Sequence, residues 1–183
     1  MSDETSVERA LASWRYVGVE RPAFAMPPGP GQESVWDYPR PPRIAPDARE
    51  IVVRAGALLV ARSRRALRVL ETASPPTFYL PPDDVDLSLL EADSGSSSCE
   101  WKGRARYFAV RLGTEVLRSA AWTYRAPRPA YAALRDHLAF YPALLECYVG
   151  GERARPQPGG FYGGWITSEL TGPFKGEPGS RGW

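Results

Sequence analysis

Short apolar runs separated by glycine and proline are the main pattern along this chain. Residues 51–55 and 58–61 are apolar and rich in β-branched side chains, and they flank Gly56-Ala57, which suits a two-residue hairpin turn. Residues 144–155 repeat this arrangement around a Gly-Gly turn. Runs of this length, bounded by turn residues, are typical of strands. The pattern therefore predicts a fold built mainly from antiparallel β-hairpins.

The longest predicted hairpin covers residues 100–112 and 115–125 and turns at Gly113-Thr114. A two-residue turn pairs Leu112 with Glu115, and it then pairs Tyr107 with Ala120. Because side chains alternate between the two faces of a strand, one face should carry a set of large rings around very small residues. This set consists of Cys99, Trp101, Gly103, Ala105, Tyr107, Ala120, Trp122 and Tyr124.

Large rings around small residues predict a hollow with flat, apolar walls, which suits a planar or cationic ligand. The alternative is that another part of the chain fills the hollow and makes it core. Glu71, Tyr79 and Lys102 are the expected polar groups at its rim. Strand alternation places Lys102 on the opposite face, so only a bulge or a sheet edge would bring it to the hollow.

The remaining segments are shorter and less regular. Residues 1–47, rich in proline, are expected to form an extended N-terminal arm, and residues 48–183 a single β-rich domain. The glycine-rich tail should form an ordered strap anchored by Trp165 and Trp183, where Lys175 could help to hold an anion. The other expected elements are a short helix at 6–14, a helix or strand at 65–71, a strand at 77–80, a surface loop at 92–98 and a helix at 130–138.

Composition supports one globular unit and narrows the function classes. The chain has 183 residues, of which 43% are hydrophobic and 24% charged, as in ordinary globular proteins. Its formal net charge of +2 is too small to indicate a nucleic-acid-binding surface. Of its 23 basic residues only Lys102 and Lys175 are lysines. Its two cysteines lie far apart, and no segment has the length or hydropathy of a membrane span or a secretory leader. We therefore expect a cytoplasmic protein without a membrane partner.

Several motifs resemble the family catalogued as domain of unknown function 427. They are residues 33–39 (ESVWDYP), 68–71 (RVLE), 79–82 (YLPP), 99–103 (CEWKG), 120–124 (AAWTY), 140–142 (FYP) and 159–165 (GGFYGGW). The resemblance implies a mainly β, β-tent-like fold of antiparallel sheets packed across one another, with short helices. Many proteins of this fold hold zinc with paired CxxC motifs. This chain lacks both pairs, so we expect no structural zinc.

Some catalogues label this family as putative nucleotidyltransferases. That reaction needs paired carboxylates for Mg²⁺ and phosphate-binding glycines just before them. Asp84 and Asp86 supply an Asp-x-Asp pair, but the preceding segment 71–76 contains no glycine, and prolines before Asp83 favour a turn. Nucleotidyl transfer is therefore not expected, and whether this acidic turn binds a cation stays open.

Three functions remain for the hollow. The first is a small-molecule-binding module with an unknown ligand and unknown cofactor. The second is an enzyme of unknown reaction that uses Glu71, Lys102 or Cys99 as its polar group. The third, least expected because the net charge is small, is a single-stranded nucleic-acid binder that uses Arg104, Arg106 and the aromatic tail.

Overall fold

The computed structural model of the chain describes residues 3–183 and is mainly β, with several antiparallel sheets. The strands are β1 (Glu33–Ser34), β2 (Arg43–Asp47), β3 (Ile51–Ala55), β4 (Leu58–Ser63), β5 (Ala66–Leu70), β6 (Thr77–Tyr79), β7 (Leu90–Cys99), β8 (Gly103–Leu112), β9 (Glu115–Thr123), β10 (Leu138–Phe140), β11 (Glu146–Val149), β12 (Glu152–Arg153), β13 (Arg155–Pro156), β14 (Trp165–Ile166) and β15 (Leu170–Thr171). The helices are α1 (Asp3–Ala12) and the 3-10 helices η1 (Val35–Asp37), η2 (Pro82–Asp84), η3 (Leu87–Leu89) and η4 (Pro129–Leu134).

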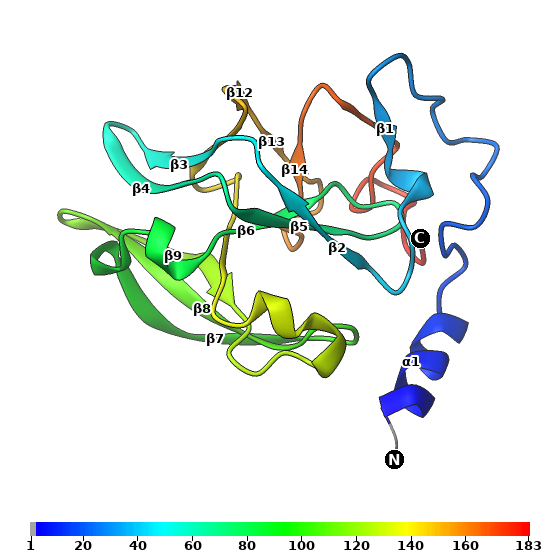
Figure 1. The fold of residues 1–183 in the computed structure, drawn as a ribbon, viewed down its shortest axis with the longest axis horizontal. Coiled ribbons are helices and arrows are strands. Elements are labelled where there is room, and N and C mark those ends of the chain that lie inside the picture. The colour runs from blue at the N-terminus through cyan, green and yellow to red at the C-terminus, as the bar shows by residue number, and fades with distance from the viewer. Residues whose placement is uncertain (1–2) are drawn as a thin grey trace.

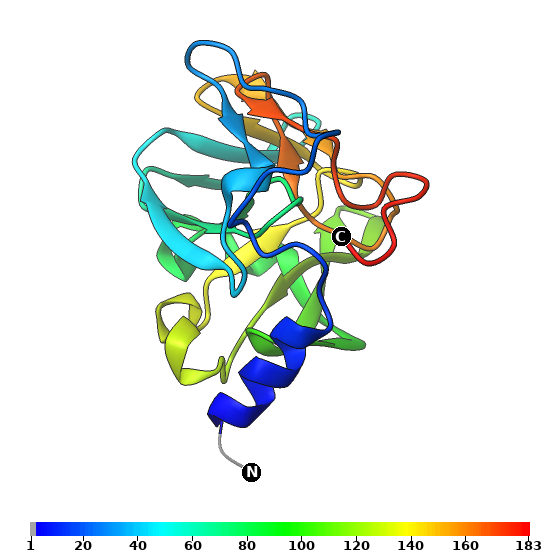
Figure 2. The same cartoon turned by 90° about the vertical axis from the view of Figure 1, so that its right-hand side faces the viewer.

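Three sheets form the body of the molecule (Figure 1). The strand orders are β10-β9-β8-β7, β12-β11-β3-β4 and β2-β5-β6, and every pairing within these sheets is antiparallel. Figure 2 shows α1 at one end of the molecule and the C-terminal segment along one side. β1 and β15 form a separate parallel pair that joins the N-terminal part of the chain to the tail.

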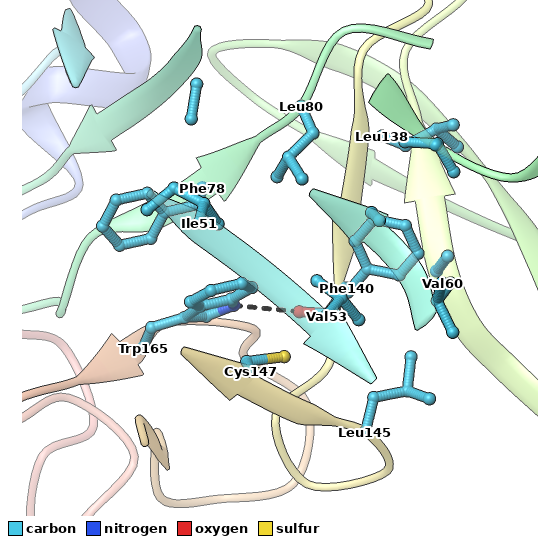
Figure 3. Packing of buried hydrophobic residues seen from close by; sticks show 14 of the residues in the cluster. Ile51, Val53, Val60, Phe78, Leu80, Leu138, Phe140, Leu145, Cys147 and Trp165 are labelled. Carbon is cyan, nitrogen blue, oxygen red and sulfur yellow. Dashed lines mark hydrogen bonds between the residues drawn. The ribbon is translucent and has the colours of Figure 1, made fainter. Parts of the chain in front are cut away.

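The main core lies between the β3-β4-β11 and β8-β9-β10 strands, where apolar side chains from both sheets meet (Figure 3). Ile51, Val53 and Cys147 come from one sheet, and Phe140 comes from the other. Trp165 from the tail completes the cluster, and its Nε1 donates to the Phe140 carbonyl at 3.0 Å. The tail is therefore part of the core.

The segment expected to be an arm contributes to two sheets. β2 pairs with β5 along its whole length, and Trp36 is buried in a second cluster together with Leu70. The N-terminal helix runs from Asp3 to Ala12, close to the predicted 6–14.

The long hairpin turns where predicted, but its register changes further along. Leu112 pairs with Glu115, as a two-residue turn requires. A bulge between Phe108 and Val110 then shifts the partner strand by two residues, so Tyr107 pairs with Trp122 and not with Ala120. Because the shift is an even number of residues, Tyr107 and Trp122 still share a face. At the bulge the Ala120 side chain points into the main core and not toward the aromatic face.

Two predicted local elements are wrong. Residues 92–98 belong to β7, an edge strand whose serines tolerate solvent on the side where no strand pairs. Residues 130–138 do not form one helix. The 3-10 helix η4 ends at Leu134, Asp136 adopts a left-handed φ of 60°, and β10 begins at Leu138. Residues 65–71, which the pattern left open, contain strand β5.

The first testable prediction concerns the tail. Trp165 is fully buried, whereas the neighbouring Phe161 is 63% exposed. Trp165→Ala should lower the free energy of unfolding by about 3–5 kcal/mol, because it removes a buried ring and a hydrogen bond. Phe161→Ala is the matched control and should change it by less than about 0.5 kcal/mol. Denaturant unfolding measures both values, and equal losses would contradict this placement of the tail.

Candidate functional site

A cavity of about 240 Å³ lies against the β7-β8-β9 sheet, where β5, β6, the tail and Trp14, just after α1, line it. Its lining includes seven of the eight residues proposed from the sequence: Glu71, Tyr79, Cys99, Lys102, Tyr107, Trp122 and Tyr124. The exception is Trp101, which is buried in the adjoining cluster and does not reach the cavity. The predicted aromatic hollow is thus present as a space, and the tail closes one side without filling it.

Trp122 is the central ring of the cavity wall. Its Nε1 donates to the Tyr79 hydroxyl at 3.2 Å, and its ring centroid lies 4.5 Å from that of Tyr141. The tail passes so close at Gly163 that a Cβ there would lie 2.2 Å from the indole. Gly163 has no unusual φ, so close approach alone accounts for the glycine. Three segments that are far apart in sequence therefore hold this ring in place.

Three tyrosines around the cavity, Tyr79, Tyr124 and Tyr141, have raised pKa values and are neutral hydrogen-bonding groups. Burial raises the pKa of Tyr79, although nearby Lys102 partly opposes this effect. Burial likewise raises the pKa of Tyr124 and of Tyr141. At the mouth, the Tyr107 and Ser97 hydroxyls form a 2.8 Å hydrogen bond. The walls thus offer aromatic faces together with phenol groups that can donate or accept.

Lys102 reaches the cavity because the strand does not begin where the pattern placed it. β7 ends at Cys99 and β8 begins at Gly103, so the three residues between them form a turn. Strand alternation therefore does not apply to Lys102, and its side chain is 8% exposed and lines the cavity. Gly103 itself lies outside: with φ of 98°, its missing side chain would point toward Ala126 and Arg128. A larger residue there would not fill the cavity.

The tail and the N-terminal region add groups that were not among the site residues expected from the sequence. Lys175 is 6% exposed, and its Nζ lies 3.6 Å from the Trp14 ring centroid and 5.4 Å from that of Tyr162. Burial, and then the nearby Arg40 guanidinium, lower the pKa of Lys175 to about 8. The motif in the tail suggested an anion-binding role for Lys175, but only the folded chain brings it into the lining of the same cavity as Lys102.

Glu71 lines the cavity and is paired with Arg40, which lies outside the lining. Arg40 Nε lies 3.2 Å from Glu71 Oε1, and its other nitrogens donate to the carbonyls of Tyr16 and Thr72 at 2.9 Å. Arg40 is therefore fully engaged, which is what a guanidinium that is only 4% exposed requires. Glu71 lines the cavity with its charge already paired.

Other candidate groups lie elsewhere. Asp84 accepts hydrogen bonds from Ser63 and Arg65 at 2.6 Å each, and Asp86 caps η3 by accepting from Ser88. These contacts give both carboxylates a structural role, and neither lines the cavity. The single histidine, His137, is also absent from the lining. In the part of the chain that the structure describes, no group of three or more His, Cys, Asp or Glu side chains could hold a metal ion, and no helix could span a membrane.

Comparison with known proteins assigns the middle of the chain to a protein family. A family model described as "Domain of unknown function (DUF427)" matches residues 43–151, from the start of β2 to the turn after β11. This span is more than half of the chain and contains β7, β8 and β9. Lys175 and Gly163 lie beyond it. No curated protein matches the chain.

A second testable prediction follows from the contact between the tail and Trp122. Gly163→Ala places a methyl group against the indole, so the tail or the ring must move. We expect a loss of roughly 1–3 kcal/mol in unfolding free energy and an altered near-ultraviolet circular dichroism spectrum. Gly29→Ala is the control, since its Cβ would meet only a glutamine side-chain oxygen at 3.3 Å. Identical behaviour of the two variants would show that the tail does not pack on Trp122.

Proposed function

The chain belongs to the DUF427 family, whose description names no activity, and we propose that it is a small-molecule-binding protein whose ligand occupies the aromatic cavity. Folded protein interiors are packed closely and leave few spaces larger than a water molecule. A space of about 240 Å³ between a sheet and a tail that is itself ordered therefore favours an occupant. This cavity is the observation that carries the proposal.

The lining favours a planar ligand. Trp122 and Tyr141 meet at 45°, and Tyr79 and Tyr124 at 39°, so their rings offer flat surfaces at several orientations. Such faces bind rings by offset stacking or edge contact. The hydroxyls of Tyr107 and Ser97 at the mouth supply polar partners that orient a bound molecule.

The nucleic-acid alternative has less support. Arg104 and Arg106 are exposed on β8, and neither lines the cavity. Single-strand binders place basic groups and stacking rings along one groove. Here the two arginines lie in a separate hollow beside Tyr107 and Phe108, while Trp122, Tyr124 and Tyr79 line the cavity without them. We also propose a cytoplasmic location, because the free cysteines Cys99 and Cys147 suit a reducing compartment.

The test of the proposal is binding of a neutral planar probe, benzamide, followed by nuclear magnetic resonance. We expect weak, saturable binding, with the largest shifts at Trp122 and at residues beside it. Ala105→Leu should abolish binding, since Ala105 is a small residue in the lining. Ala130→Leu, an equal change at an exposed position, should leave binding intact. Wild-type affinity in a folded Ala105→Leu variant would contradict the proposal.

Catalysis in the same cavity is a second candidate function, and one contact favours it. The Lys102 ammonium lies beside the Cys99 thiol: burial acts to lower the pKa of Lys102, but Cys99 and Tyr79 more than compensate and raise it. An ammonium next to a thiol stabilises the thiolate, which is the nucleophilic form. Cys99 is half-buried and lines the cavity, so a ligand there could reach its sulfur.

Alkylation by iodoacetamide tests whether Cys99 is a reactive thiol. We expect Cys99 to react readily in the folded protein and Lys102→Met to slow that reaction. Cys147 is the internal control, because it is fully buried and burial raises its pKa. Mass spectrometry assigns the modified residue. Equal rates for Cys99 in the wild-type and Lys102→Met proteins would remove the support for a nucleophilic role.

A further inference from the structure

Both lysines of the chain line the same cavity. All other basic residues are arginines, and they are spread over the whole sequence. Lys102 comes from the turn between β7 and β8, and Lys175 from the tail beyond β15, so the fold brings together two groups 73 residues apart in sequence (175 − 102). A lysine presents a compact ammonium that can turn toward a ligand, whereas an arginine presents a larger planar group.

Neither lysine ammonium is paired with a carboxylate in the described part of the chain. Among the residues that the structure describes, no carboxylate oxygen lies within 4.0 Å of Lys102 or Lys175, although ten other ion pairs meet that limit. Both lysines are more than nine-tenths buried. Burying a cation without a carboxylate partner is costly. At Lys102 the neighbouring Cys99 and Tyr79 offset this cost and raise its pKa, whereas burial and Arg40 lower the pKa of Lys175. Lys175 is therefore the position that most lacks an anionic partner.

The surroundings of Lys175 leave room for one more negative charge. The groups that act on it are Arg40, Glu71, Glu100 and Cys99, with Tyr162 and Trp14 as ring neighbours. Glu71 is paired with Arg40, and Glu100 is exposed and accepts from Trp14 Nε1 at 3.2 Å. Two lysines and two glutamates line the cavity, and Arg40, which does not line it, pairs with Glu71. Counting Arg40 together with Lys102 and Lys175 against Glu71 and Glu100 leaves one positive charge (3 − 2).

Building on the proposed function, we propose that the ligand carries an anionic group on a planar ring, and that the ammonium groups of Lys102 and Lys175 bind this group. The aromatic walls hold the ring, and the anion supplies the carboxylate partner that both lysines lack among the described residues. A carboxylate attached to an aromatic ring is the simplest molecule with both parts. This assignment gives the lysines a role that packing alone does not explain.

The test compares three probes of the same size that differ in charge: benzoate, benzamide and benzylamine. Isotope-labelled lysine gives only two side-chain signals in this protein, so binding at each ammonium can be followed directly. At neutral pH we expect benzoate to bind about tenfold to a hundredfold more tightly than benzamide, as for a charge-assisted hydrogen bond. Benzylamine should bind least, and both lysine signals should shift with benzoate.

Variants separate charge from packing. Lys175→Met keeps an unbranched side chain but removes the ammonium, and it should reduce benzoate affinity to that of benzamide while leaving benzamide affinity unchanged. Because it removes an unpaired buried cation, it should also raise the melting temperature of the ligand-free protein. Lys102→Met should weaken benzoate binding in the same way. Arg181→Met, which removes an exposed charge from the tail, is the control and should change neither quantity.

The pH dependence provides a further check on Lys175. Its ammonium loses a proton as the pH rises through about 8, and a bound anion favours the protonated form. Benzoate affinity should therefore be highest below that pH and fall above it, whereas benzamide affinity should stay constant.

The outcomes distinguish this inference from the function on which it rests. Equal binding of benzoate and benzamide would overturn the anion assignment but leave the aromatic site standing. Tightest binding of benzylamine would show that the carboxylates of Glu71 and Glu100 decide the ligand's charge. That result would also overturn the anion assignment. If none of the three probes binds, both the function and the inference fail. A Lys175→Met variant that is less stable but binds benzoate normally would make Lys175 structural.

Discussion

The position of the Trp122 indole is the constraint on which the cavity depends. Its Nε1 donates a hydrogen bond to the Tyr79 hydroxyl, its ring contacts that of Tyr141, and the tail packs against it at Gly163. These contacts come from three separate segments, so the ring is fixed only when the sheets and the tail are all in place. Fixing the ring prevents it from collapsing into the space beside it, and this keeps the cavity open.

The arginines and the lysines of this chain have different roles, the first in the fold and the second in the cavity. Arginines make ion pairs that join segments, for example Arg40 with Glu71 and Arg49 with both Asp47 and Glu169. The two lysines make none of these contacts in the described part of the chain and instead face the cavity. A buried cation without a partner lowers stability. A protein can retain such a group where it binds a ligand, since functional sites are often less stable than an optimised core.

Much of the site could be predicted because strand alternation is a local rule. The rings of Tyr107 and Trp122 were placed on one face by counting residues from the turn, and an error of two residues in register did not change the face. The same counting failed for Gly103 and Ala120. A turn at residues 100–102 and a bulge near Ser119, whose φ is 50°, interrupt the alternation there, and neither has a clear signal in the sequence.

Other features depend on contacts between distant segments, which no local pattern reveals. The serine-rich segment at 92–98 resembles a loop by composition, yet it pairs along β8 because one neighbour is enough for an edge strand. Trp14 and Lys175 come together only when the N-terminal helix and the tail fold onto the same side. Proline and glycine content predicted irregular chain in both regions, but not where that chain would pack.

The measurement that tests the central claim most directly is a crystal structure of the protein grown with benzoate. The account predicts a flat ring against the Trp122 and Tyr79 side of the cavity, with the carboxylate within hydrogen-bond distance of a lysine ammonium. Trp122 and Gly163 should keep the positions described here. A cavity that contains only water in those crystals, or one closed by its own side chains, would contradict the claim that it is a binding site.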